Sequence, residues 1–152
     1  MKTTCCDFKP KAAAVALGRW GLGVMVFFIG LGKFLGPKFP DITWFAYDYI
    51  VPRFEKTWLP NWLLVPYAFC LPFAEVMLGA LLILGIGRNR VLFLTGLMFV
   101  TLSFGQVLLK EWVVVSENMI YLFVTGALLF LGEHDRWVFP IGRKSTGSPN
   151  QT

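Results

Sequence analysis

Four long runs of apolar residues, separated by shorter polar segments, dominate the pattern of this 152-residue chain. A helix needs about 20 consecutive apolar residues to cross the hydrocarbon core of a bilayer. Each run approaches or exceeds that length. The pattern therefore predicts an all-α integral membrane protein, built as a four-transmembrane-helix bundle. The predicted spans cover residues 12–35, 62–86, 91–109 and 113–132.

The connection over residues 36–61 is the longest segment between two predicted spans, and four prolines divide it. Its aromatic side chains include Trp44, Tyr47, Tyr49 and Trp58. Tryptophan and tyrosine favour the headgroup layer of a membrane. We expect this connection to form an aromatic cap loop with a short interfacial helix. Residues 1–11 and 133–152 are predicted to be polar tails.

An even number of spans places both chain termini on one side of the membrane. Basic residues on the cytoplasmic side of a membrane protein usually outnumber those on the other side. The side that holds the termini carries Lys2, Lys9, Lys11, Arg19, Arg88, Arg90, Arg136, Arg143 and Lys144, and the opposite side carries Lys33, Lys38, Arg53, Lys56 and Lys110. The bias predicts that both termini lie in the cytoplasm and that the aromatic cap lies outside.

Composition agrees with a membrane protein, because 56% of the residues are apolar and only 15% are charged. Ordinary globular domains carry about 25% charged residues. No stretch rich in lysine and arginine is present, so we expect no nucleic-acid partner. With one histidine, His134, and three cysteines without a C-x-x-C motif, the chain predicts no metal site and no intrinsic cofactor. For Cys5 and Cys6 a plain thiol is preferred over palmitoylation.

Polar residues inside the predicted spans are the candidates for function. Glu75 falls almost at the middle of the second span. An ionised group at that depth costs at least about 2.5 kcal/mol, so it needs a partner, a proton or a water-filled pocket. We expect the other polar residues to face the bundle interior with it, because lipid cannot solvate them. The candidate set, a ligand-binding or buried polar cluster, is Arg19, Lys33, Glu75, Gln106, Glu117, Asn118 and Tyr121.

Three interpretations of this cluster are open from the residues alone. In the structural interpretation, Arg19–Glu75 and Lys33–Glu117 are ion pairs that lock the helices in register. In the second interpretation, the cluster lines a pocket beneath the cap and holds a small polar or quinone-like ligand. In the third, the cluster forms a proton path in which Glu75 titrates.

Three segments follow one another along the chain: GRWGLGVMVFFIGLGKF in the first span, LPFAEVMLGALLILGIGRNR in the second and ENMIYLFVTGALLFLGEHDRW in the fourth. Together they resemble the DoxX-like family of small four-helix membrane proteins. The resemblance covers about residues 16–137. Its matching positions are Arg19, Gly30, Lys33, Pro72, Glu75, Gly79, Gly85, Arg88, Asn118, Tyr121 and Gly132.

The resemblance implies a four-helix bundle of the inner membrane. Members of this family include subunits of a thiosulfate:quinone oxidoreductase, proteins linked to redox homeostasis and membrane assembly factors. We therefore expect a small inner-membrane subunit associated with quinone-linked electron transfer or redox homeostasis. It is expected to bind a quinone-like or small polar ligand in the bundle, to associate with other membrane subunits and not to be catalytic alone. The alternatives are a structural or assembly subunit of a larger membrane complex and a small-solute carrier.

Overall fold

The computed structural model describes residues 10–36 and 43–134, and these residues are all-helical. The described parts of the chain contain no strand. The elements, in order, are α1 (Pro10–Phe34), the π-helical segment η1 (Phe45–Ile50), α2 (Val51–Phe54), α3 (Asn61–Leu84), α4 (Arg88–Leu108), α5 (Trp112–Phe130) and the short 3-10 helix η2 (Leu131–His134).

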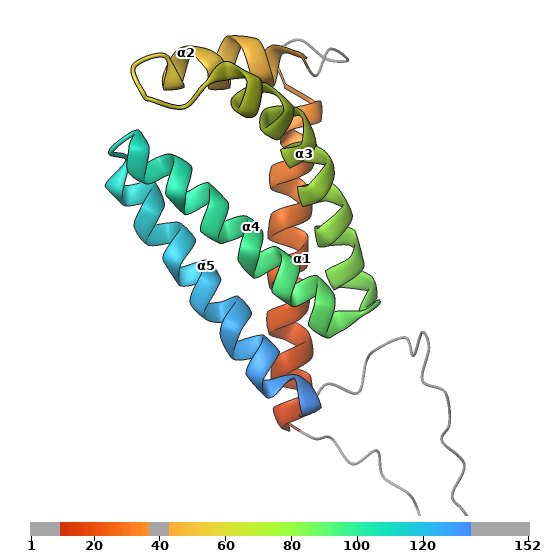
Figure 1. The fold of residues 1–152 in the computed structure, drawn as a ribbon. Helices are drawn as coiled ribbons and strands as arrows, with labels where there is room; N and C mark the ends of the chain where they lie inside the picture. Colours follow the sequence, from red (N-terminus) through yellow and green to blue (C-terminus); the bar gives the residue numbers. More distant parts are fainter. Residues whose placement is uncertain (1–9, 37–42, 135–152) are drawn as a thin grey trace, which may run out of the picture.

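The four long helices α1, α3, α4 and α5 are long and apolar enough to cross a membrane. They contain 25, 24, 21 and 19 residues, which at about 1.5 Å of rise per residue matches a hydrocarbon core of about 30 Å. The all-helical class with four candidate spans is therefore confirmed. The start of α1 and the segment η2 that follows α5 lie at the same end of the molecule (Figure 1). Which side of a membrane that end faces stays a prediction.

Helices α1 and α3 form the tightest helix pair of the fold, because glycines let their backbones meet. A Cβ atom on Gly79 would lie 2.5 Å from the backbone nitrogen of Phe27 and 2.8 Å from the carbonyl oxygen of Gly23. A Cβ atom on Gly30 would lie 2.7 Å from the Cβ atom of Glu75. Small residues at such crossings permit close helix packing in lipid.

Helices α4 and α5 form a hairpin that diverges from the α1–α3 pair toward the end of the molecule where α2 lies (Figure 1). The turn that precedes α4 contains two glycines with positive φ, Gly85 at 71° and Gly87 at 59°. The Ile86 N–H donates to the Leu81 carbonyl and the Gly85 N–H to the Leu82 carbonyl. This bonding pattern ends α3 in a left-handed glycine turn, which changes the chain direction into α4.

The connection between α1 and α3 is helical over η1 and α2 and lies across one end of the bundle (Figure 1). Phe45 and Phe54 are buried there, and Tyr47 is exposed. Arg53 Nη2 lies 3.0 Å from Glu111 Oε1 in the turn between α4 and α5. These contacts join the connection to both helix pairs. Its location in a membrane interface stays a prediction.

Candidate functional site

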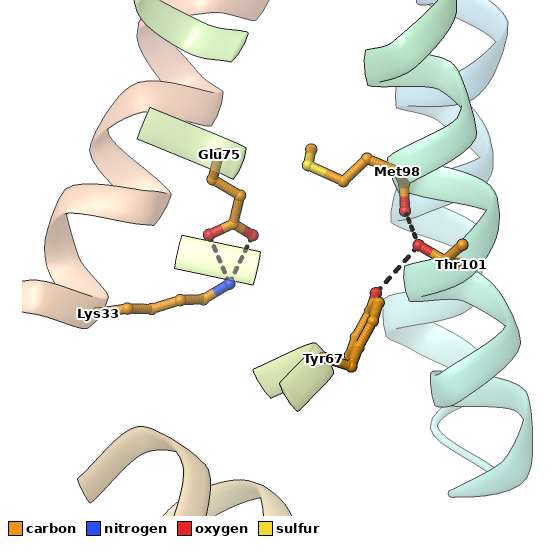
Figure 2. Close-up of polar contacts among 5 residues, drawn as sticks. All are labelled: Lys33, Tyr67, Glu75, Met98 and Thr101. Atoms are coloured by element: carbon orange, nitrogen blue, oxygen red, sulfur yellow. Dashed lines mark hydrogen bonds and ion pairs between the residues drawn. The ribbon is translucent and has the colours of Figure 1, made fainter. Parts of the chain in front are cut away.

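A buried ion pair joins α1 to α3. Lys33 Nζ lies 2.5 Å from Glu75 Oε1 and 2.7 Å from Glu75 Oε2 (Figure 2). Glu75 is 1% exposed, and the ammonium lies 5.1 Å from the centre of the Phe45 ring. Gly30 allows this pairing: it brings the Glu75 Cβ against α1, and Lys33 follows one helical turn later on the same face. The carboxylate near the middle of α3 therefore has a cationic partner.

The predicted pairs Arg19–Glu75 and Lys33–Glu117 are both wrong. Arg19 and Lys33 are fourteen residues apart on α1, which separates them by about 21 Å along the helix axis. Glu75 lies at the level of Lys33. Glu117 lies on α5 and is exposed.

Arg19 instead donates from Nη1 to the backbone carbonyls of Leu82 and Ile83, and its side chain is 1% exposed. The last four carbonyls of a helix have no partner within the helix and carry its negative partial charge. Arg19 therefore caps the C-terminal end of α3. Two backbone oxygens thus accept hydrogen bonds from a guanidinium that is buried in the interior.

The remaining predicted residues, Gln106, Glu117, Asn118 and Tyr121, belong to the α4–α5 hairpin. Asn118 is buried, and the Tyr121 ring packs 5.6 Å from the Phe99 ring. Within the described parts of the chain, no hydrogen bond or ion pair joins these four side chains to the Lys33–Glu75 pair. The seven predicted residues are thus distributed over separate places in the fold.

A groove of about 330 Å³ lies between α3 and α4, which we call the α3–α4 groove. Its volume falls in the roughly 300–1,000 Å³ range of small-molecule sites. Tyr67 and Thr101 provide its hydroxyl groups. The groove is lined by Tyr67, Cys70, Leu71, Ala74, Met77, Leu78, Leu94, Leu97, Met98 and Thr101.

A hydrogen bond spans the α3–α4 groove. The hydroxyl oxygens of Tyr67 and Thr101 are 3.0 Å apart, and Thr101 Oγ1 donates to the Met98 carbonyl at 2.8 Å (Figure 2). Glu75 comes from the same helix as Tyr67, and the Met98 side chain extends from α4 toward it (Figure 2). The groove is therefore mostly apolar. Two consecutive hydrogen bonds cross it, from Tyr67 through Thr101 to the Met98 carbonyl, and the buried ion pair lies nearby.

A second hollow, of about 240 Å³, lies between α4 and α5 and is less suited to a polar ligand. Its hydroxyl group, on Thr125, is buried and donates to the Tyr121 carbonyl at 2.7 Å. Across the described residues, no group of three or more histidine, cysteine, aspartate or glutamate side chains could hold a metal ion. The α3–α4 groove is thus the better candidate site.

Sequence reasoning did not select Tyr67 or Thr101. Both are polar residues in consecutive spans, which is the signal that could have found them. A lone hydroxyl in a helix is a weaker signal than a charge, because an unpaired charge is the costlier group in lipid. Comparisons of the chain with family models, with curated proteins and with solved structures found no match.

Proposed function

We propose that this protein is a small multi-pass subunit of the inner membrane that binds a quinone-like molecule in the α3–α4 groove and takes part in quinone-linked electron transfer. The groove carries this proposal. Its walls are apolar, and a hydroxyl pair, Tyr67–Thr101, crosses it. Apolar lining with a few placed polar groups is the usual construction of a small-molecule site. Electrons would pass through the bound quinone and partner subunits.

Two further features support the proposal. The groove is lined by partly exposed side chains of helices apolar enough to span a membrane, among them Met77, Leu94 and Leu97, so a lipid-soluble ligand could enter from the bilayer. The resemblance of three segments to the DoxX-like family implies the same association with quinones. Membership of that family is part of the proposal.

The test is a lipid extraction from protein purified out of a quinone-containing membrane. We expect quinone to co-purify with the wild-type chain. Ala74→Phe fills the groove and should reduce the bound quinone several-fold. Ala127→Phe is the matched control, because Ala127 is exposed on α5 and lines no part of the groove. Absence of quinone from the wild-type sample, together with unchanged quinone reduction in a deletion strain, would refute the proposal.

A second candidate function is a structural or assembly subunit of a larger membrane complex. The exposure of α5 favours it, because Phe123 and Phe130 project from that helix with 78% and 86% of their surface exposed. Large aromatic side chains on one helix fit the surface of a partner helix. Native gels in a mild detergent test this function. A monomer without any partner in freshly solubilised membrane would contradict it.

A further inference from the structure

The hydrogen bonds across the α3–α4 groove have a fixed direction. The Thr101 hydroxyl has a single proton, which it donates to the Met98 carbonyl at 2.8 Å. Thr101 therefore has no proton left for Tyr67, and the 3.0 Å contact between their hydroxyls requires Tyr67 as the donor. The chain of bonds runs from Tyr67 to Thr101 to the Met98 carbonyl.

This direction decides what the groove offers to a ligand. The phenol of Tyr67 donates its only proton to Thr101, and its oxygen can still accept a hydrogen bond. Tyr67 is 37% exposed, and its side chain lines the groove. A ligand that donates a hydrogen bond extends the existing chain, and successive hydrogen bonds polarise one another favourably. A ligand that only accepts must first break the bond between Tyr67 and Thr101.

The apolar part of the groove suits a flat ring. Met77 and Met98 line it from α3 and α4, and thioether sulfurs make favourable contacts with aromatic rings. Ala74 and Cys70 are small side chains on the same wall, which leave space for a ring. Ring contacts and one hydrogen-bond acceptor therefore occur in the same groove.

We infer that the α3–α4 groove binds the reduced form of a quinone, the quinol, in preference to the oxidised form. A quinol hydroxyl donates to the Tyr67 oxygen, whereas a quinone carbonyl cannot. The inference rests on the proposed function and adds the redox state that the site prefers. Tyr67 and Thr101 are the specificity-determining residues.

The experiment measures the affinity of the purified full chain, in nanodiscs, for a decyl-substituted benzoquinone and for its quinol under anaerobic conditions. One net hydrogen bond is worth about 0.5–1.5 kcal/mol, so the quinol should bind about two- to thirteenfold more tightly. The ratio of the two dissociation constants is the readout. A general loss of protein stability would weaken the binding of both ligands equally and leave this ratio unchanged.

Three variants test the direction of the hydrogen bonds. Thr101→Val removes the acceptor for Tyr67, which frees the phenol proton for a ligand, and the preference should shift toward the quinone. Thr101→Ser keeps the hydroxyl and should keep the wild-type ratio. Tyr67→Phe removes donor and acceptor together and should bring the ratio close to one. If Thr101→Val does not fold, Tyr67→Phe and Thr101→Ser still decide the outcome.

The results separate the inference from the function on which it rests. Binding of both forms with equal affinity, or a preference for the quinone in the wild-type chain, overturns the inference and leaves quinone binding established. An unchanged ratio in Tyr67→Phe also overturns it. Failure of either form to bind the wild-type chain overturns the proposed function as well.

Discussion

The Lys33–Glu75 ion pair is buried, so removing one partner should lower the free energy of unfolding. Glu75→Ala leaves a lysine in the bundle with no counter-charge. Breaking a buried ion pair costs about 3–5 kcal/mol. For Glu75→Ala we expect a cost at the lower end of this range, about 3 kcal/mol. The reason is that 19% of the Lys33 side-chain surface is exposed, so the ammonium can extend toward water. Glu75→Gln keeps an oxygen that accepts from Lys33 and should cost less, about 1–2 kcal/mol.

The decisive variant is the double substitution Lys33→Met with Glu75→Met. Replacing both members of a buried pair by apolar residues of similar volume is often neutral or stabilising. The double variant should therefore be more stable than either single variant, Glu75→Met or Lys33→Met, by about 2–3 kcal/mol. Unfolding free energies come from titration with a denaturing detergent, followed by tryptophan fluorescence. Additive losses in the double variant would refute the pairing, and so would wild-type stability in both single variants.

Two further predictions concern packing and surface charge. Gly79→Ala should lower the free energy of unfolding by about 1–3 kcal/mol, since the added Cβ would lie 2.5 Å from the Phe27 backbone. Gly32→Ala is the control, because nothing lies within 4 Å of a Cβ at that position. Equal effects of the two substitutions in the same denaturation assay would contradict the close approach of α1 and α3. Arg53→Ala should cost about 1 kcal/mol or less, because its pair with Glu111 is exposed. The cost should be smaller at high salt in a thermal melt, since salt screens the ion pair and leaves the hydrogen bond from Arg53 to the Tyr49 hydroxyl. A larger, salt-independent cost would contradict this.

The sequence identified the charged residues of the interior more readily than their partners. Glu75 stood out because a carboxylate in an apolar run is costly wherever the helix packs. Its pairing depends on the axial offset between α1 and α3, which Gly23, Gly30 and Gly79 set through backbone contact. Residue numbers do not contain this offset, and for that reason the sequence could not show that Lys33, rather than Arg19, reaches Glu75.

The candidate ligand site was less predictable than the ion pair. Tyr67 and Thr101 are ordinary polar residues in a membrane helix, and neither demands a partner as a charge does. Their hydroxyls meet because the chain reverses direction at the left-handed turn of Gly85 and Gly87, which brings α4 back beside α3. A long-range contact of this kind leaves no periodic signal in the chain. The direction of the hydrogen bonds also depends on the local Thr101–Met98 contact.

The sequence by itself determined that the chain is all-helical in its described parts and has four helices apolar enough for a membrane. Hydropathy over about 20 residues is a local property, and in lipid each backbone polar group must be satisfied within its own helix. The tertiary structure alone decided that Lys33 neutralises Glu75, that Arg19 caps α3, and that a groove lies between α3 and α4. These depend on helix offset and crossing angle, which arise from contacts between residues far apart in the chain.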